Sequence, residues 1–163
     1  AGGKVVEVDI KGATKLTDIT PVGRLRDLEK LTAPSPGFAS LEPLRGLRLR
    51  HLGIMNAGAV RDLAPLAGMP LEALHAWGFC GDDLSPLRGM PLRTLNVGYC
   101  AKRRDLSPLA GLPLEYLCLN STSADDVSVL AGMPLVELGL RWTKVRDLSP
   151  LRGMPLRNLN IEK

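Results

Sequence analysis

A fourteen-residue pattern, which stands as LSPLRGMPLRTLNV from Leu84, recurs along nearly the whole chain and constrains its fold more than any other feature. Close copies begin at Leu41, Leu63, Leu106, Val127 and Leu148, and a looser copy begins at Ile19. The innermost strand position falls at Val8, Leu31, Leu52, Leu74, Leu95, Leu117, Leu138 and Leu159, in steps of 21 to 23 residues. A period of this length is typical of a solenoid, in which each repeat packs against its neighbours.

The repeat leaves no room for a second fold. It extends from about Val5 to Ile161 of a 163-residue chain, so we expect one domain over residues 1–163 and no catalytic domain beside it. The chain starts with AGGKVV, without an initiator Met, and both of its ends fall on strand patterns without a dedicated cap. Uncapped ends expose core and strand edge, so we expect either a fragment of a larger protein or a solenoid whose ends associate.

Each copy divides into a strand and a return limb. Leu95 and Val97 lie on one face of a short strand, because strand side chains alternate with a period of two. Further on, a small or hydrogen-bonding residue turns in under a bend, at Ala57, Cys100, Thr122 and Thr143. The return limb pairs a residue such as Ser85 with Pro86, which is typical of an N-cap followed by the first helical position. Only about six residues are available there, which favours a 3-10 turn over an α-helix.

A D-[LI]-x-P-L motif opens the return limb. It stands as Asp18-Ile19-Thr20-Pro21-Val22 and as Asp105-Leu106-Ser107-Pro108-Leu109. With this motif, the chain resembles the leucine-rich repeat family over almost its whole length. Within that family it resembles the internalin-like repeats of bacteria. The resemblance implies an α/β fold, a right-handed solenoid of about eight coils with a parallel β-sheet on the concave face and short 3-10 turns on the convex face. It also implies a role in binding proteins.

Charged residues recur at two positions of the repeat and alternate in sign from coil to coil. The first series is Arg61, Asp82, Arg104, Asp125 and Arg146. The second is Glu29, Arg50, Glu72, Arg93, Glu115, Val136 and Arg157, interrupted at Val136. Neighbouring strands lie about 5 Å apart, so we expect opposite charges to pair between coils. The acidic pairs Asp82-Asp83 and Asp125-Asp126 then belong to this ladder rather than to a metal site. Arg104, in the basic run from Lys102, is then engaged rather than available to nucleic acid.

Other chemistry is not indicated by the sequence. The three cysteines, at 80, 100 and 118, have no C-x-x-C spacing, which argues against a disulfide framework and a zinc site and favours a reducing, cytoplasmic compartment. A bond between Cys80 and Cys100 stays open as an alternative. No apolar run reaches 18 residues and no signal peptide is visible, so we expect no membrane span. His75 and Cys118 lie two coils apart, about 10 Å, which is too far for a nucleophile and its base. We therefore expect no enzyme, no cofactor and no metal.

The outward strand positions are not needed for the core and can encode recognition. Three rows of such positions, starting at Glu7, Asp9 and Lys11, show no consensus between repeats. Across the middle coils they gather residue types that dominate interface energetics, namely His51, Met55, His75, Trp77, Tyr116 and Arg141. Tyr99 and Trp142 follow at the rim. We predict that this face binds a protein partner, with ordinary exposed surface as the alternative interpretation.

Such a module would be the regulatory or sensing segment of a larger bacterial signalling or surface protein. The competing hypothesis is structural, an assembly module in which the open ends of the solenoid stack on one another as an end-to-end homo-oligomer.

Overall fold

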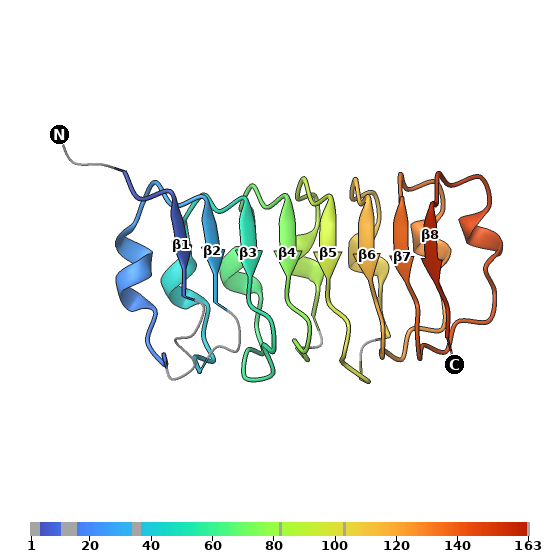
Figure 1. Ribbon diagram of the computed structural model, residues 1–163, viewed down its shortest axis with the longest axis horizontal. Helices are drawn as coiled ribbons and strands as arrows, with labels where there is room; N and C mark the ends of the chain where they lie inside the picture. Colours follow the sequence, from blue (N-terminus) through green and yellow to red (C-terminus); the bar gives the residue numbers. More distant parts are fainter. Residues whose placement is uncertain (1–3, 11–15, 34–36, 82, 103, 163) are drawn as a thin grey trace.

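The computed structural model of the chain describes residues 4–10, 16–33, 37–81, 83–102 and 104–162. Within them lie eight strands, β1 (Glu7–Asp9), β2 (Lys30–Thr32), β3 (His51–Gly53), β4 (Ala73–His75), β5 (Thr94–Asn96), β6 (Tyr116–Cys118), β7 (Glu137–Gly139) and β8 (Asn158–Asn160). Between them lie 3-10 helices, η1 (Thr20–Arg24), η2 (Glu42–Leu44), η3 (Ala64–Leu66), η4 (Ser85–Leu87), η5 (Ser107–Leu109), η6 (Ser128–Leu130) and η7 (Ser149–Leu151). The strands form one parallel sheet in chain order, with the helical turns behind it (Figure 1). The predicted eight coils, parallel sheet and 3-10 turns are therefore confirmed.

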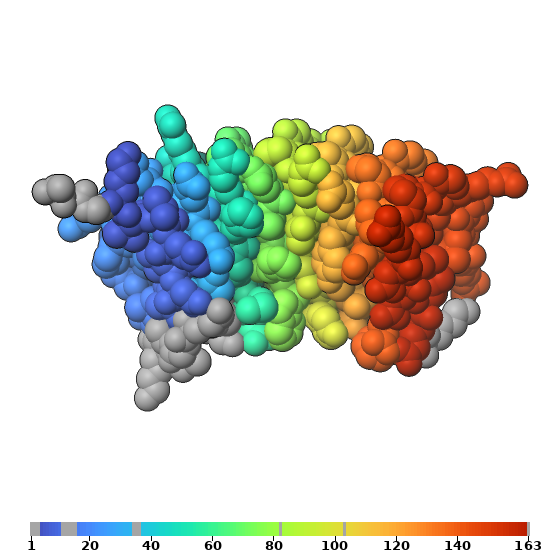
Figure 2. Space-filling view, turned by 45° about the horizontal axis from the view of Figure 1, so that its top comes forward, coloured from blue at the N-terminus to red at the C-terminus, as the bar shows by residue number. Residues whose placement is uncertain are grey.

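The strands pair in one register, so that equivalent residues of successive coils lie side by side. Leu74 pairs with Leu95, and Leu95 pairs with Leu117, with every one of these side chains fully buried. Leu87 of η4 closes the same core from the return limb and is also fully buried. Each fully buried leucine of this kind contributes about 1.5–3 kcal/mol. The inward residues thus form the continuous spine that the period predicts, and the coils follow one another in chain order along an elongated body (Figure 2).

An aspartate caps the start of most of the 3-10 turns. The sequence predicts that the residue before each proline is the N-cap, and this prediction is wrong, because Ser85 is already the first residue of η4. Asp83, two residues earlier, accepts hydrogen bonds at 2.7 Å from both the backbone N–H and the hydroxyl of Ser85. The N–H, followed by the hydroxyl, lowers the pKa of Asp83 below its usual value. The same N–H contact is made by the other capping aspartates, Asp18, Asp62, Asp105, Asp126 and Asp147.

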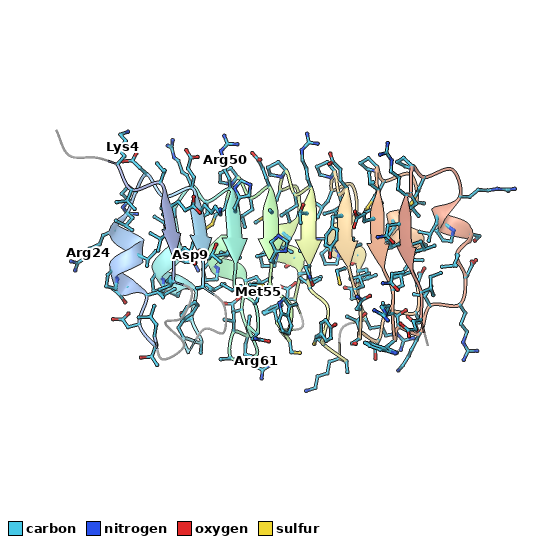
Figure 3. All side chains as sticks on the ribbon, in the orientation of Figure 1. Lys4, Asp9, Arg24, Arg50, Met55 and Arg61 are labelled. Atoms are coloured by element: carbon cyan, nitrogen blue, oxygen red, sulfur yellow. The ribbon has the colours of Figure 1, made fainter. Side chains whose placement is uncertain are left out.

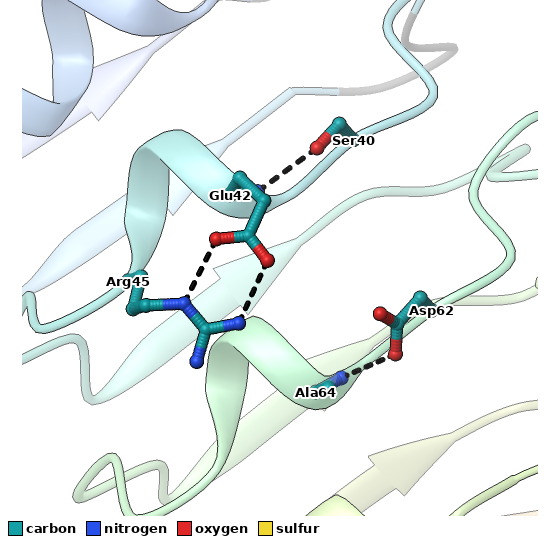
Figure 4. Close-up of polar contacts among 5 residues, drawn as sticks. All are labelled: Ser40, Glu42, Arg45, Asp62 and Ala64. Atoms are coloured by element: carbon teal, nitrogen blue, oxygen red, sulfur yellow. Dashed lines mark hydrogen bonds and ion pairs between the residues drawn. The ribbon is translucent and has the colours of Figure 1, made fainter.

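The second turn uses a serine in place of the aspartate. Ser40 accepts a hydrogen bond from the backbone N–H of Glu42 at 3.1 Å, and the carboxylate of Glu42 binds the guanidinium of Arg45 through two bonds of 2.7 and 2.8 Å. Figure 4 shows this turn beside the next one, where Asp62 caps the N–H of Ala64. The capping role is therefore kept between coils even where the residue type changes.

A left-handed residue turns the chain at the end of each described bend from β3 to β7. These residues are Asn56 (φ 60°), Gly78 (φ 81°), Tyr99 (φ 61°), Ser121 (φ 56°) and Trp142 (φ 53°). Of the residues predicted to turn inward after them, Ala57, Cys100 and Thr122 are buried, and Thr143 is partly buried. Thr122, for example, is 3% exposed and donates its hydroxyl hydrogen to the carbonyl of Leu119 at 2.7 Å.

One coil places a large aromatic ring at this inward position. Phe79 is fully buried there, in the place of Ala57, Cys100 or Thr122 in the neighbouring coils. Gly81 makes room for it, because a Cβ atom at Gly81 would lie 2.3 Å from the ring of Phe79. The missing side chain at Gly81 thus compensates for the large ring of Phe79, and the core of this coil stays closely packed.

Ion pairs join neighbouring coils at both predicted charge positions. Arg104 binds Asp125 in the first series, and Arg50 binds Glu72 in the second. Arg93 likewise binds Glu115. Asp82 lies outside the described residues, so its predicted pairing with Arg61 and Arg104 stays a prediction.

The first and last coils expose apolar side chains that the middle coils bury. Val5 and Val6 are 45% and 49% exposed at one end. At the other end, Leu159 of β8 is 39% exposed and Ile161 is 47% exposed, whereas Leu138 of β7 is 2% exposed. The core positions of these coils have a neighbouring coil on only one side among the described residues.

Candidate binding face

The solvent-facing side of the sheet carries the predicted rows. Glu7, Lys30 and His51 pair in register to begin the first row, and Asp9 pairs with Thr32 to begin the second. The third row begins at Lys11, which lies outside the described residues. Its later members follow the strand ends, where the carbonyl of Asn120 accepts the N–H of Tyr99 and that of Arg141 accepts the N–H of Ser121. We call the surface formed by these three rows the sheet face.

A hollow of about 280 Å³ lies over β2 to β4 on the sheet face. Its lining brings together three of the predicted site residues, His51, Met55 and His75. Gly53 and Ala73 lie between these longer side chains, and their small size leaves the space open. Met55 follows β3 and lies beyond the end of that strand (Figure 3). We call this the β2–β4 hollow.

Two basic side chains of the β2–β4 hollow, His75 and Lys30, add little net charge at neutral pH. Partial burial, followed by repulsion from His51, lowers the pKa of His75 below its usual value, so the imidazole of His75 is neutral at pH 7. Lys30, at the margin, binds Glu7 at 2.7 Å, which balances its charge. The hollow is therefore suited to an apolar or aromatic group rather than to an anion.

Tyr116 lies in a second, smaller hollow of about 140 Å³ over β6 to β8, together with Cys118, Asn120 and Glu137. Burial, followed by the nearby Cys118 and Glu137, raises the pKa of Tyr116 above its usual value, so its hydroxyl keeps its proton and can donate a hydrogen bond. The strand β5 separates this hollow from the β2–β4 hollow. Three of the six predicted residues thus line the β2–β4 hollow, and Tyr116 lines the second hollow.

Trp77 and Arg141 each contact an aromatic ring at the rim of the sheet face. The rings of Trp77 and Tyr99 meet edge to face, with centroids 5.5 Å apart. The guanidinium of Arg141 lies 5.2 Å from the ring centroid of Trp142 and also binds Glu162. Tyr99 and Trp142 are half exposed, and sequence reasoning placed them at the rim but missed their left-handed backbone. The signal for it was present, because Gly78 and Asn56 occupy the same position in neighbouring coils.

The predicted acidic pair Asp125-Asp126 is used in pairing and capping. Asp125 binds Arg104, and Asp126 caps the N–H of Ser128, as the ladder interpretation predicts. Within the described ranges, no group of three or more His, Cys, Asp or Glu side chains is arranged to hold a metal ion. The described residues also contain no helix that is long and apolar enough to cross a membrane. All three cysteines carry thiols rather than disulfides, and the Cys80 thiol lies 3.8 Å from the carbonyl oxygen of Tyr99.

Comparison with solved structures finds close matches to this architecture. An internalin (InlF) from Listeria monocytogenes superposes with a TM-score of 0.84 at 29% identity, covering 89% of this chain and 44% of that one. An internalin C2 (InlC2) from the same species superposes with a TM-score of 0.81 at 28% identity, covering 89% of this chain and 66% of that one. The chain is a leucine-rich repeat solenoid. It spans about half of the length of the InlF chain and about two thirds of the length of the InlC2 chain.

Comparison of the sequence with family models and with curated proteins finds no match in either set.

Proposed function

We propose that the solenoid recognises a partner protein through its sheet face, as the regulatory or sensing segment of a larger bacterial signalling or surface protein. The observation that carries this proposal is the β2–β4 hollow, where His51, Met55 and His75 surround an open space that the core does not use. Its volume of about 280 Å³ is large enough for one large apolar side chain of a partner. Binding energy in protein interfaces concentrates in such central, desolvated pockets.

The residues around the hollow supply the contacts that an interface needs. Met55 offers a flexible thioether that adapts to the shape of an apolar group. The neutral imidazole of His75 offers both a flat ring and a hydrogen-bond donor and acceptor. We also assign Trp77, which follows β4, and Tyr116 of β6 to the interface, each with a polar tip that can reach a partner.

The experiment is affinity capture with a variant that fills the hollow. Ala73→Arg places a long side chain in a row where other coils carry Lys30 and Tyr116, so the fold accommodates it. The matched control is Ala67→Arg behind the sheet, at an exposed position where neighbouring coils carry Arg45 and Arg88. Proteins that bind the immobilised chain are identified by mass spectrometry.

We expect one set of proteins to be retained by the wild type and by Ala67→Arg and to be lost with Ala73→Arg. The double change of Trp77 and Tyr116 to alanine should reduce the same set. Equal retention by the wild type and all of these variants would refute binding at the sheet face.

Self-association through the last coil is a second candidate function. It is favoured by the exposure of Leu148 (37%), Leu159 (39%) and Ile161 (47%), which present apolar surface next to β8, the last strand of the sheet in the described part of the chain. Sedimentation over a hundredfold range of concentration should then show a rising mass for the wild type and a constant mass for Leu159→Lys. A constant monomeric mass for both proteins would exclude this candidate.

A further inference from the structure

The bends after the strands contain two aromatic residues that the fold does not require. Tyr99 and Trp142 have φ angles of 61° and 53°, in the left-handed region that bulky residues rarely adopt. Gly78 occupies the same position with φ 81° and would meet no such strain. Because Tyr99 and Trp142 are 50% and 51% exposed, burial does not account for their presence. Strained residues that packing does not explain are characteristic of functional sites.

The two rings are held in place by contacts on the surface. Tyr99 packs edge to face against Trp77, and Trp142 lies against the guanidinium of Arg141. The coil between them carries Ser121, a small residue in the same left-handed conformation. The resulting order along the edge is large, small, large, and we call Tyr99, Ser121 and Trp142 the aromatic rim.

The spacing of the aromatic rim indicates the kind of ligand. Its two aromatic residues come from coils separated by one other coil, and strands lie about 4.8 Å apart, so their backbone positions repeat at about 10 Å. A polyproline II helix has three residues per turn and rises about 3.1 Å per residue, so every third residue returns to the same side after about 9.3 Å. The rim and such a helix therefore share one repeat distance.

The chemistry of the aromatic rim agrees with this spacing. Polyproline II segments leave their backbone carbonyls without internal hydrogen bonds and dock on aromatic residues. The Tyr99 hydroxyl and the Trp142 indole N–H can donate to such carbonyls, while their rings pack on proline. The carboxylates that follow Ser121 in the chain, Asp125 and Asp126, are engaged by Arg104 and Ser128, which makes them poor partners for the hydroxyl groups of a sugar.

We propose that the aromatic rim binds a proline-rich segment of a partner protein in the polyproline II conformation. Tyr99 and Trp142 each pack on one residue of the segment, one helical turn apart, and Ser121 leaves room for the residues between them. The proposal rests on the proposed function, protein recognition by the solenoid, and names the chemistry of one part of the partner.

The test measures binding of a fluorescein-labelled peptide of ten prolines by fluorescence anisotropy, with a glycine–serine peptide of equal length as the reference. The variants are Tyr99→Gly and Trp142→Gly, and the matched control is Ser121→Gly at the equivalent position between them. Urea unfolding of each variant is measured in parallel. Since glycine relieves left-handed strain, the unfolding midpoints of the two aromatic variants should be equal to or above that of the wild type.

We expect the wild type and Ser121→Gly to bind the proline peptide and not the reference peptide. Each aromatic variant should bind it at least tenfold more weakly without losing stability. No binding of the proline peptide at millimolar concentration, or equal binding by Tyr99→Gly and Trp142→Gly, would overturn the proposal. Selective binding of a soluble glucan oligosaccharide by the same residues would also overturn it. If these assays fail while Ala73→Arg still abolishes partner capture, only the aromatic rim proposal is lost.

Discussion

The central leucine of β5 offers a direct test of the stacked core, through a comparison with its equivalent in β8. Leu95 is fully buried and lies in register between Leu74 and Leu117, so Leu95→Ala would leave a cavity enclosed on both sides. Loss of the buried side chain together with the cavity term should destabilise the protein by about 3–4 kcal/mol. Leu159 occupies the same position in β8 but is 39% exposed and, within the described ranges, pairs with Leu138 alone. Leu159→Ala should therefore cost about 1 kcal/mol, since less apolar area returns to water and no enclosed cavity forms.

Urea unfolding followed by circular dichroism gives both free energies, provided that the slope of the transition is the same in the two variants. Repeat proteins can lose end coils before the middle, so amide hydrogen exchange should be measured as well. We expect Leu95→Ala to accelerate exchange along the adjacent strands and Leu159→Ala to accelerate it in the last coil only. Equal losses of stability in the two variants, or a larger loss for Leu159→Ala, would refute the continuous spine.

Three further predictions concern contacts on the surface. Gly139→Ala should destabilise the protein by about 1–3 kcal/mol in urea unfolding, because the new Cβ atom would lie 2.8 Å from the amide oxygen of Asn120. Gly53→Ala should be nearly neutral, because its Cβ atom would meet its nearest neighbouring atom at 3.5 Å. A double-mutant cycle on Arg93 and Glu115 should give about 0.2–1 kcal/mol, decreasing as salt is added, since both side chains are largely exposed. Backbone and hydroxyl hydrogen bonds lower the pKa values of most capping aspartates in the folded protein. Their contribution to stability is therefore complete above about pH 4, the pKa of an aspartate in the unfolded chain, and is lost as the pH falls through their lowered pKa values in the folded protein. The urea midpoint should therefore drop below pH 4, and an unchanged midpoint down to pH 2 would contradict the caps.

The coil architecture was predictable because each coil contacts only its neighbours. The period placed Leu74, Leu95 and Leu117 in one row, and no long-range pairing had to be guessed. The cap was not identified correctly, because Ser85 is a good N-cap by type and stands directly before a proline. The geometry selects Asp83 instead, whose longer reach from outside the turn allows it to bind both the N–H and the hydroxyl of Ser85.

The sequence predicted which residues lie on the candidate binding face, but it did not predict the hollows between them. Alternation along each strand assigned His51 and His75 to the outward face, and both residues are exposed there, next to the buried Leu52 and Leu74. The β2–β4 hollow depends on what lies between them, two small residues at Gly53 and Ala73, and sequence reasoning that looked for large interface residues passed over these positions. Packing between coils sets such spaces, and residue type alone does not reveal them.

Trp77 links the two parts of the proposed binding surface. It stands two residues after His75, which ends β4 and lines the β2–β4 hollow, and its ring contacts Tyr99 of the aromatic rim. A partner that inserts a side chain into the hollow and lays a proline-rich segment along the rim would therefore pass over Trp77. Because the core leucines set the spacing of the coils, changes on this surface can alter recognition without altering the fold. The same spacing holds the backbone positions of Tyr99 and Trp142 about 10 Å apart, whichever side chains surround them. The aromatic rim can therefore select an extended ligand by its repeat distance.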